Sequence, residues 1–268
     1  MRFNVWLAGL LLVLAGGPLS AARQPVIAII IDDLGMQYNR GMQVARLPAE
    51  IACSILPHSP YAKDIASQAH RQGKEILLHL PMQTEQGHLL EAGALTVAMS
   101  RQDMINVLRQ DLASIPYVQG INNHMGSLLT QRSQAMDWLM YAVKQHDKLY
   151  FVDSRTTAAT VALQSARAHR IPSTRRDVFL DHDPRPQAIR IQLKRLLQHA
   201  RKYGSAVAIG HPHVDTLKVL SEWLPTLEAE GVQLVPVSSI IKQRENRSHQ
   251  IWHAYWSPSQ KAVKNSKQ

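Results

Sequence analysis

Residues 26–35 read VIAIIIDDLG, an isoleucine-rich apolar run that ends in two adjacent aspartates and is closed by a leucine and a glycine. A continuous apolar run of this length is typical of a strand buried on both faces, as in parallel sheets. Two neighbouring carboxylates after such a strand are costly to bury unless they are paired or bound to a cation. The stretch therefore predicts a central parallel strand with polar chemistry at its carboxyl end.

The rest of the chain alternates between short apolar runs and segments with helical spacing. Further strands are expected at residues 51–56, 75–80, 118–121, 149–152, 178–180, 205–209 and 232–235, with helices at 61–72, 100–115, 133–146, 158–168, 185–203 and 215–230. Ser100 and Asp103 form a capping-box pattern, and Asp215 is placed to cap the last helix. Regular alternation indicates an α/β fold in which helices cross between parallel strands, either a (β/α) barrel or an open doubly wound sheet. No glycine-rich phosphate loop follows the first strand, which disfavours dinucleotide binding.

The amino-terminal segment has the pattern of a secretory signal peptide over residues 1–22. Arg2 precedes an apolar run over residues 5–14, and Ser20 and Ala22 are the small residues of a cleavage site. The run is short for a membrane span of roughly 20 residues, although an uncleaved anchor is the other interpretation. We therefore expect an exported protein of the periplasm or cell envelope, with a single barrel domain over residues 23–241.

The chain is basic, with 30 Lys and Arg against 20 Asp and Glu and a formal net charge of +10. In an exported protein this charge suits a neighbourhood of anionic envelope polymers or lipid head groups, and no nucleic-acid module is visible. Residues 242–268 form a basic tail, expected to be flexible, for which a weak contact with anionic envelope components and simple solvation are both open. The single Cys53 excludes an internal disulfide.

Ionisable and amide side chains recur where the expected strands end, which is where such barrels carry their chemistry. Carboxylate and imidazole are the ligands that zinc accepts, and a catalytic zinc site keeps one position open. We expect Asp33, His79 and His124 to bind a divalent metal, most simply zinc, with Asp32 as general base and His211 as general acid. The remaining candidates for substrate binding or support of the site are Asn123, Asp153, Arg155, Gln83 and His213.

Each of these residues also has a structural interpretation. A lone histidine more often makes a structural hydrogen bond than it binds a metal. Asp33 could cap the following turn, His213 could pair with Asp215 at a helix start, and Asn123 could be a turn residue with its own hydrogen bonds satisfied. The case for a site therefore rests on the whole set at successive strand ends.

Several motifs in the right order resemble the divergent polysaccharide deacetylases. These are residues 31–35 (IDDLG), 79–82 (HLPM), 122–127 (NNHMGS), 153–156 (DSRT), 179–181 (FLD) and 210–213 (GHPH), within a resemblance that spans residues 25–241. The resemblance implies a distorted (β/α) barrel of about seven to eight mostly parallel strands. It also implies that Asp32 is the base, that Asp33 and His79 bind the metal, and that His211 is the catalytic histidine.

The chain departs from the deacetylase pattern at two motifs. Gln83 stands where the ordinary enzymes have the second histidine of His-x-x-x-His, and residues 122–124 stand where they have a motif with an arginine. We infer that His124 replaces the missing imidazole. The leading hypothesis is a metal-dependent hydrolase that removes acetyl groups from an envelope carbohydrate. The alternatives are an inactive barrel that binds glycan or peptidoglycan, and a hydrolase of another bond such as a phosphoester.

Overall fold

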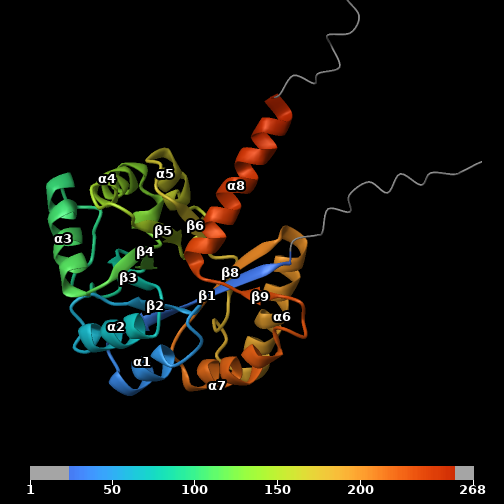
Figure 1. Cartoon of the computed structure of the whole chain (residues 1–268). Coiled ribbons are helices and arrows are strands. Elements are labelled where there is room, and N and C mark those ends of the chain that lie inside the picture. The colour runs from blue at the N-terminus through green and yellow to red at the C-terminus, as the bar shows by residue number, and fades with distance from the viewer. Residues whose placement is uncertain (1–23, 257–268) are drawn as a thin grey trace, which may run out of the picture.

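The protein folds into a curled parallel sheet with helices around its outside (Figure 1). The computed structural model describes residues 24–256, with side chains described up to residue 247; the expected signal peptide lies outside the described residues. The strands are β1 (Val26–Leu34), β2 (Ala52–Ile55), β3 (Ile76–Met82), β4 (Val118–Met125), β5 (Tyr150–Asp153), β6 (Ser173–Arg175), β7 (Val178–Phe179), β8 (Ser205–Gly210) and β9 (Gln233–Leu234). The α-helices are α1 (Tyr38–Ala45), α2 (Ala62–Arg71), α3 (Arg101–Ser114), α4 (Ser133–Lys144), α5 (Ala162–Ala168), α6 (Pro186–Tyr203), α7 (Val214–Trp223) and α8 (Val237–Trp256).

The sheet has the strand order β6-β5-β4-β3-β2-β1-β8-β7, with β9 added beside β1, and every pairing between these strands is parallel. The two ends of the order are consecutive in the chain, and the short link between β6 and β7 spans the gap. The backbone N–H of Arg176 donates to the carbonyl of Asp153 on β5, and that of Asp177 donates to Val207 on β8, each at 2.9 Å. The sheet thus curls into the distorted barrel that the sequence predicts.

Alternate residues of β1 face the two sides of the sheet, because side chains along a strand point to opposite faces. Ile27, Ile29 and Ile31 belong to the large core between the sheet and the outer helices. Ala28 and Ile30 belong to a smaller core inside the barrel. This explains the uninterrupted apolar run of β1, since both faces are buried.

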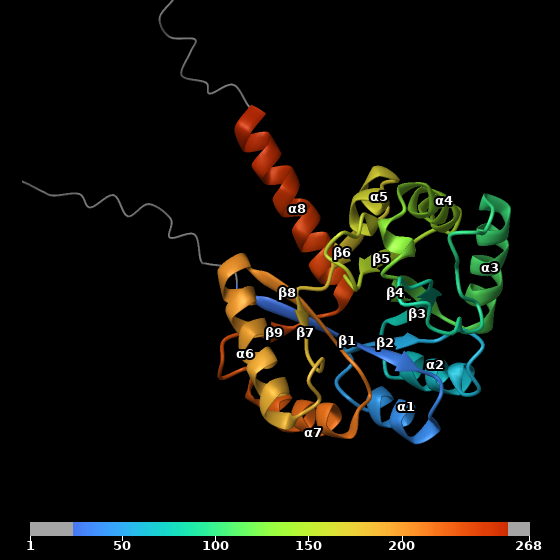
Figure 2. The same cartoon turned by 180° about the vertical axis from the view of Figure 1, so that it is seen from behind.

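The carboxyl-terminal helix α8 begins at the amino end of the barrel. Val237, Ile240 and Ile241 pack into the inner core, and the Glu75 carboxylate accepts the backbone N–H of Ser238 at 3.2 Å. The side chain of Arg244 is held by Asp177 at 2.6 Å. The boundary expected after Ile241 therefore falls inside a helix, which projects beyond the body of the protein (Figures 1 and 2).

Other departures from the expected elements are local. The last outer helix, α7, ends at Trp223 rather than near residue 230, and His213 rather than Asp215 precedes its first turn, without a capping hydrogen bond from its side chain. Strand β4 continues through the polar residues 122–125 that the pattern placed after a strand. No helix among the described residues is long and apolar enough to cross a membrane.

Candidate metal centre and catalytic cleft

The parallel register brings the polar residues of four strands together at the carboxyl end of the barrel. Ile31 on β1 pairs with Gly210 on β8, and His79 on β3 pairs with Asn122 on β4. Asp32 and Asp33, His79, His124 and His211 therefore meet around one cleft of about 450 Å³. A larger hollow of about 530 Å³ is lined by Gln24 and Pro48, which precede β1 and β2, and so lies at the opposite strand ends.

The backbone of Asp33 explains how two adjacent carboxylates reach the same cleft. Neighbouring side chains of a regular strand point to opposite faces. Asp33 instead has φ 57°, a left-handed conformation that aspartate tolerates better than most residues, and the register with β2 shifts between Ile31 and Leu34. As a result both carboxylates approach Nε2 of His79, Asp32 Oδ2 at 3.6 Å and Asp33 Oδ1 at 3.1 Å.

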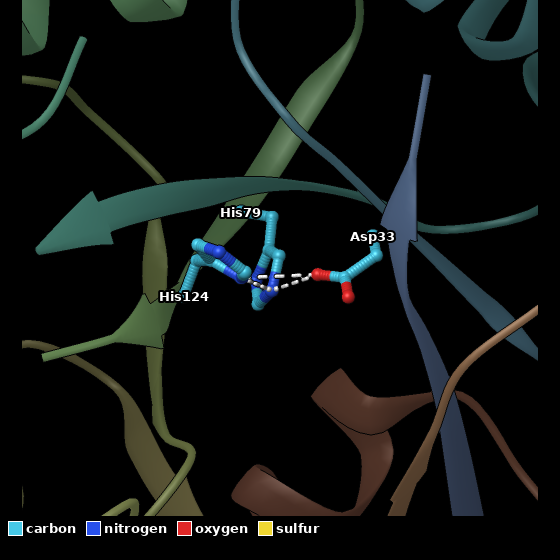
Figure 3. A group of neighbouring side chains, drawn as sticks. All are labelled: Asp33, His79 and His124. Atoms are coloured by element: carbon cyan, nitrogen blue, oxygen red, sulfur yellow. Dashed lines mark hydrogen bonds and ion pairs between the residues drawn. The ribbon is translucent and has the colours of Figure 1, made fainter. Parts of the chain in front are cut away.

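Three ligand atoms form a nearly equilateral triangle (Figure 3). Asp33 Oδ1 lies 3.1 Å from His79 Nε2 and 3.0 Å from His124 Nδ1, and the two nitrogens are 3.0 Å apart. Tetrahedral zinc with ligand bonds of about 2.0–2.1 Å separates its ligand atoms by roughly 3.3 Å, so a small expansion of the triangle admits the ion. Asp33 Oδ1 is buried and makes no hydrogen bond of acceptable angle, although both nitrogens are near. A cation shared by all three atoms satisfies this oxygen, and the donor set fits a divalent metal.

The electrostatics of the triangle favour a positive charge within it. Burial opposes ionisation of both Asp33 and His79. Contacts with His124 and His79 nevertheless hold the pKa of Asp33 well below its usual value. The charges of Asp32 and Asp33 raise the pKa of His79. These shifts mean that the cluster attracts a cation, whether a proton or a metal ion.

Asn122 connects the base candidate to the metal ligand from inside the barrel. Its buried side-chain carbonyl accepts from Ser54 Oγ at 2.7 Å and faces His79 Nδ1 at 2.9 Å. Its Nδ2 donates to Asp32 Oδ1 at 2.8 Å. Because the amide oxygen only accepts, the neutral form of His79 carries its proton on Nδ1, and the Nε2 lone pair then faces Asp33 and His124.

His211 is held by Asp181 so that its second nitrogen faces the cleft. Asp181 contacts His211 Nδ1 at 2.9 Å and also accepts from the His211 backbone N–H and from Thr216 Oγ1. Burial opposes the charge on His211, but the hydrogen bond and charge of Asp181, with Asp32 and Asp33, raise its pKa to about 9. Its Nε2 lies 3.7 Å from Asp33 Oδ2. These contacts favour the protonated form of His211 beside the candidate metal ligands.

Asp181, His211 and His213 form a second group of potential ligands. The donors already bound to Asp181 occupy its carboxylate, and His213 is exposed, with its ring centroid 5.7 Å from that of His211. The group is therefore better described as a hydrogen-bonded support for His211 than as a metal site.

The other expected site residues have different surroundings. Gln83 uses Oε1 to accept the backbone N–H of Val97 at 2.9 Å and does not line the cleft. Asp153 accepts from the backbone of Arg155 and from Thr160, also outside the cleft lining. Asn123 lines the cleft, but its amide is engaged by the backbones of Met125 and Ser154. Arg155 lines the cleft as well, and His213 does not.

Residue types alone did not identify several residues in or behind the cleft. Asn122 and Asp181 stand within the motifs quoted from the sequence, but their roles follow only from the contacts above. Arg176 and Phe179 enter the cleft because the β6–β7 link closes the barrel there. An arginine in a short link has no periodic or motif signal, so only the fold reveals it.

Comparison with known proteins agrees with the fold and the motifs. The sequence model described as divergent polysaccharide deacetylase matches residues 29–241. The chain is 37% identical to the uncharacterised protein YibQ of Escherichia coli, over 86% of this chain and 73% of that protein. It is 36% identical to an uncharacterised protein of Haemophilus influenzae, over 81% and 77% respectively.

The solved structures that share the fold include the following two. An uncharacterised protein from Agrobacterium tumefaciens superposes with a TM-score of 0.78 at 24% identity, covering 83% of this chain and 92% of that one. The catalytic domain of a peptidoglycan N-acetylglucosamine deacetylase from Eubacterium rectale has a TM-score of 0.50 at 11% identity, covering 82% and 94%. At these identities the likeness concerns the fold alone.

Proposed function

The chain belongs to the divergent polysaccharide deacetylase family, and from this membership and the cleft we propose that it is a metal-dependent hydrolase that removes acetyl groups from an envelope carbohydrate. One observation carries the proposal. A triangle of metal-ligand atoms, a buried carboxylate and a protonated imidazole line the same cleft. A metal-dependent hydrolysis of an acetyl group uses each of these components.

Asp33, His79 and His124 would hold the metal, which when bound supplies a Lewis acid for the acetyl carbonyl and for the attacking water. His124 thereby supplies the imidazole that the ordinary enzymes have at the position of Gln83. Gln83 itself accepts a hydrogen bond from the backbone N–H of Val97. Zinc suits this set of one oxygen and two nitrogens.

Asp32 serves as the general base. Its Oδ1 is fixed by Asn122, and its Oδ2 lies 3.6 Å from His79 Nε2, so the carboxylate stands beside the metal ligands without belonging to the triangle. Asp32 accepts the proton that water loses as its oxygen adds to the acetyl carbon. The negative charge that develops on the former carbonyl oxygen needs a stabilising charge nearby, as in other acyl transfers.

His211 serves as the general acid. The bond between the acetyl carbon and the amine or alcohol then breaks, acetate forms, and His211 donates its proton to the leaving nitrogen or oxygen. The contact of Nδ1 with Asp181 leaves Nε2 as the atom that delivers the proton into the cleft. Asp181 therefore positions the acid and does not touch the substrate.

Acetate release from N- and O-acetylated glycans tests the proposal. We expect the metal-loaded protein to release acetate, and Asp32→Asn and His211→Asn each to reduce kcat by at least about 100-fold, the usual contribution of a general acid or base. Asp137→Asn, on the exposed surface of α4, is the control. Equal acetate release by the wild type and Asp32→Asn would overturn the proposed role of Asp32. A protein that binds glycans without releasing acetate would instead be a binding module.

The proposal includes export to the periplasm or cell envelope, which rests on the signal-peptide pattern of residues 1–22. Envelope glycans are the acetylated polymers that an exported hydrolase meets. Fractionation of cells that express the full chain is the test. We expect a product shortened by about 22 residues in the envelope fraction, and an uncut product in the cytosol would contradict this part of the proposal.

A further inference from the structure

One wall of the cleft carries two guanidinium groups for which the proposed hydrolysis has no use. Arg155 and Arg176 both line the cleft, together with His182. Among the described residues, no carboxylate forms an ion pair with either arginine. The Arg176 guanidinium donates only to the backbone carbonyls of Ser154 and Arg155, at 2.6 and 2.7 Å. The carboxylates of Asp153, Asp32 and Asp177 offset part of the charge on Arg176 through space, but none of them forms a hydrogen bond or ion pair with either guanidinium group. Both groups therefore keep donors that an anion in the cleft can use.

The surroundings hold Arg176 in one orientation. Its guanidinium lies over the Phe179 ring, 4.8 Å from the centroid, and its two carbonyl contacts fix the remaining direction. Burial first, and Arg155 second, lower the pKa of Arg176. A guanidinium fixed in this way is preorganised to bind a planar oxyanion, because little side-chain entropy remains to be lost.

Arg155 adds a second cation to the same wall of the cleft. It has φ 51°, and its backbone is held from both sides, by the Asp153 carboxylate at its N–H and by Arg176 at its carbonyl. Its side chain makes no hydrogen bond within the described part of the chain. Backbone strain that is held in place by neighbouring contacts is common at ligand sites. Here the strained backbone places a cation at the wall of the cleft.

The arginine wall is close to the reacting groups. The Phe179 ring that lies under Arg176 also makes an edge contact with the His211 ring, with centroids 5.4 Å apart. If one molecule fills both sites, its anion therefore lies on the acetylated sugar or on the sugar next to it.

We propose that Arg155 and Arg176 form a carboxylate-binding subsite, and that the substrate is an acidic saccharide whose carboxylate lies within about one sugar unit of the acetyl group. This inference rests on the proposed function, because it assumes that an acetylated saccharide fills the cleft. The carboxylate can come from a uronic acid or from an ether-linked lactic acid on the sugar. Both offer the same planar oxyanion to the guanidinium groups.

The test compares the binding of three acetylated disaccharides that differ in charge. The neutral probe is diacetylchitobiose, and the acidic probes carry either a uronate or the lactyl ether of N-acetylmuramic acid. Binding is measured by calorimetry on metal-loaded protein with the Asp32→Asn substitution, so that turnover does not interfere. We expect at least one acidic probe to bind about tenfold more tightly than the neutral one, because the carboxylate adds charge-assisted hydrogen bonds to the guanidinium groups.

Substitutions then show whether the two arginines or the metal cause the tighter binding of the acidic probes. In the Asp32→Asn background, Arg155→Gln should reduce the preference for the acidic probe about tenfold, and Arg176→Lys should reduce it while keeping the charge. Arg71→Gln, which removes the same charge from the exposed end of α2, should leave it intact. Because the Arg155 side chain makes no hydrogen bond or ion pair among the described residues, its loss tests binding even if Arg176 variants fold poorly.

The outcomes distinguish the subsite from the proposed function. Equal affinity for neutral and acidic probes, no binding of any probe, or a preference that survives both arginine substitutions would overturn the subsite. Acetate release from the neutral and acidic probes at equal kcat/KM would overturn the subsite while supporting the hydrolase. A preference that depends on Arg155 in a protein that releases no acetate would support the subsite and overturn the hydrolase.

Discussion

Asn122 is fully buried and is the side chain on which the geometry of both Asp32 and His79 depends. Replacing it with alanine removes the acceptor that keeps the His79 proton on Nδ1 and the donor that fixes Asp32. Loss of such supporting contacts typically lowers metal affinity 10- to 100-fold. We therefore expect Asn122→Ala to bind zinc 10- to 100-fold more weakly than the wild type in a competition assay with a chromogenic chelator.

Asn106→Ala is the control for this measurement, because Asn106 is exposed on α3, where it accepts a hydrogen bond from Gln102. Unchanged zinc affinity in folded Asn122→Ala protein would show that His79 keeps its orientation without the amide. The supporting role of Asn122 would then be wrong.

The sequence places Asp33, His79 and His124 at strand ends that the fold brings together, but it could not predict the contacts around them. Asp33, His79 and His124 come together because the ends of parallel strands share one edge, a rule that needs no coordinates. The tautomer of His79 depends on which face of β4 carries Asn122, and the pattern ended that strand before Asn122. The role of Arg176 depends on where the barrel closes, which no local signal encodes.

Helix α8 covers the amino end of the barrel with an apolar face. Ile240 is fully buried within the inner core. Removing buried methylene and methyl groups from isoleucine loses their transfer free energy and leaves a cavity. We expect Ile240→Ala to lower the free energy of unfolding by about 3 kcal/mol in denaturant titrations.

Ile191→Ala removes the same atoms from α6, where the side chain is 52% exposed, and should cost less than about 0.5 kcal/mol. Equal and small losses for the two variants would mean that α8 does not contribute to the stability of the barrel.

The elements that the sequence predicted are those with strong periodicity or a clear cap. The apolar run of β1 and the capping box of Ser100 and Asp103 both have the expected structure. Helix α1 was not predicted because it is short and mostly polar. Helix α8 was not predicted because its apolar positions are few among many polar residues. Its anchors, Glu75 and the inner core, belong to distant parts of the chain.

The buried carboxylate of Asp111 makes the free energy of unfolding of the whole protein depend on pH. Asp111 Oδ1 contacts His58 Nε2 at 2.8 Å, and its Oδ2 is buried without a hydrogen bond. Burial raises the pKa of Asp111 to about 7, although His58 opposes the change. The folded state thus binds this proton more tightly than the unfolded chain, whose aspartates titrate near 4. The stabilisation is present below pH 4 and is lost as the pH rises to about 7.

We expect Asp111→Asn to gain stability relative to the wild type by about 2 kcal/mol between pH 4 and pH 7, and the difference to stay constant above pH 8. Unfolding in denaturant at a series of pH values measures this. Asp64→Asn, on the exposed surface of α2, should show no such trend. A difference between Asp111→Asn and the wild type that is flat with pH would contradict the raised pKa.

The proposed hydrolysis depends on the metal centre, and the metal content of the protein purified without chelators is its most direct test. We expect about one zinc or similar divalent ion per chain, lost in Asp33→Ala and in His124→Ala. Asp137→Ala and His169→Ala, which break a surface pair outside the cleft, should retain the ion. No metal after zinc addition and dialysis, or equal metal in the wild type and both cleft variants, would contradict the proposed centre and the hydrolase built on it.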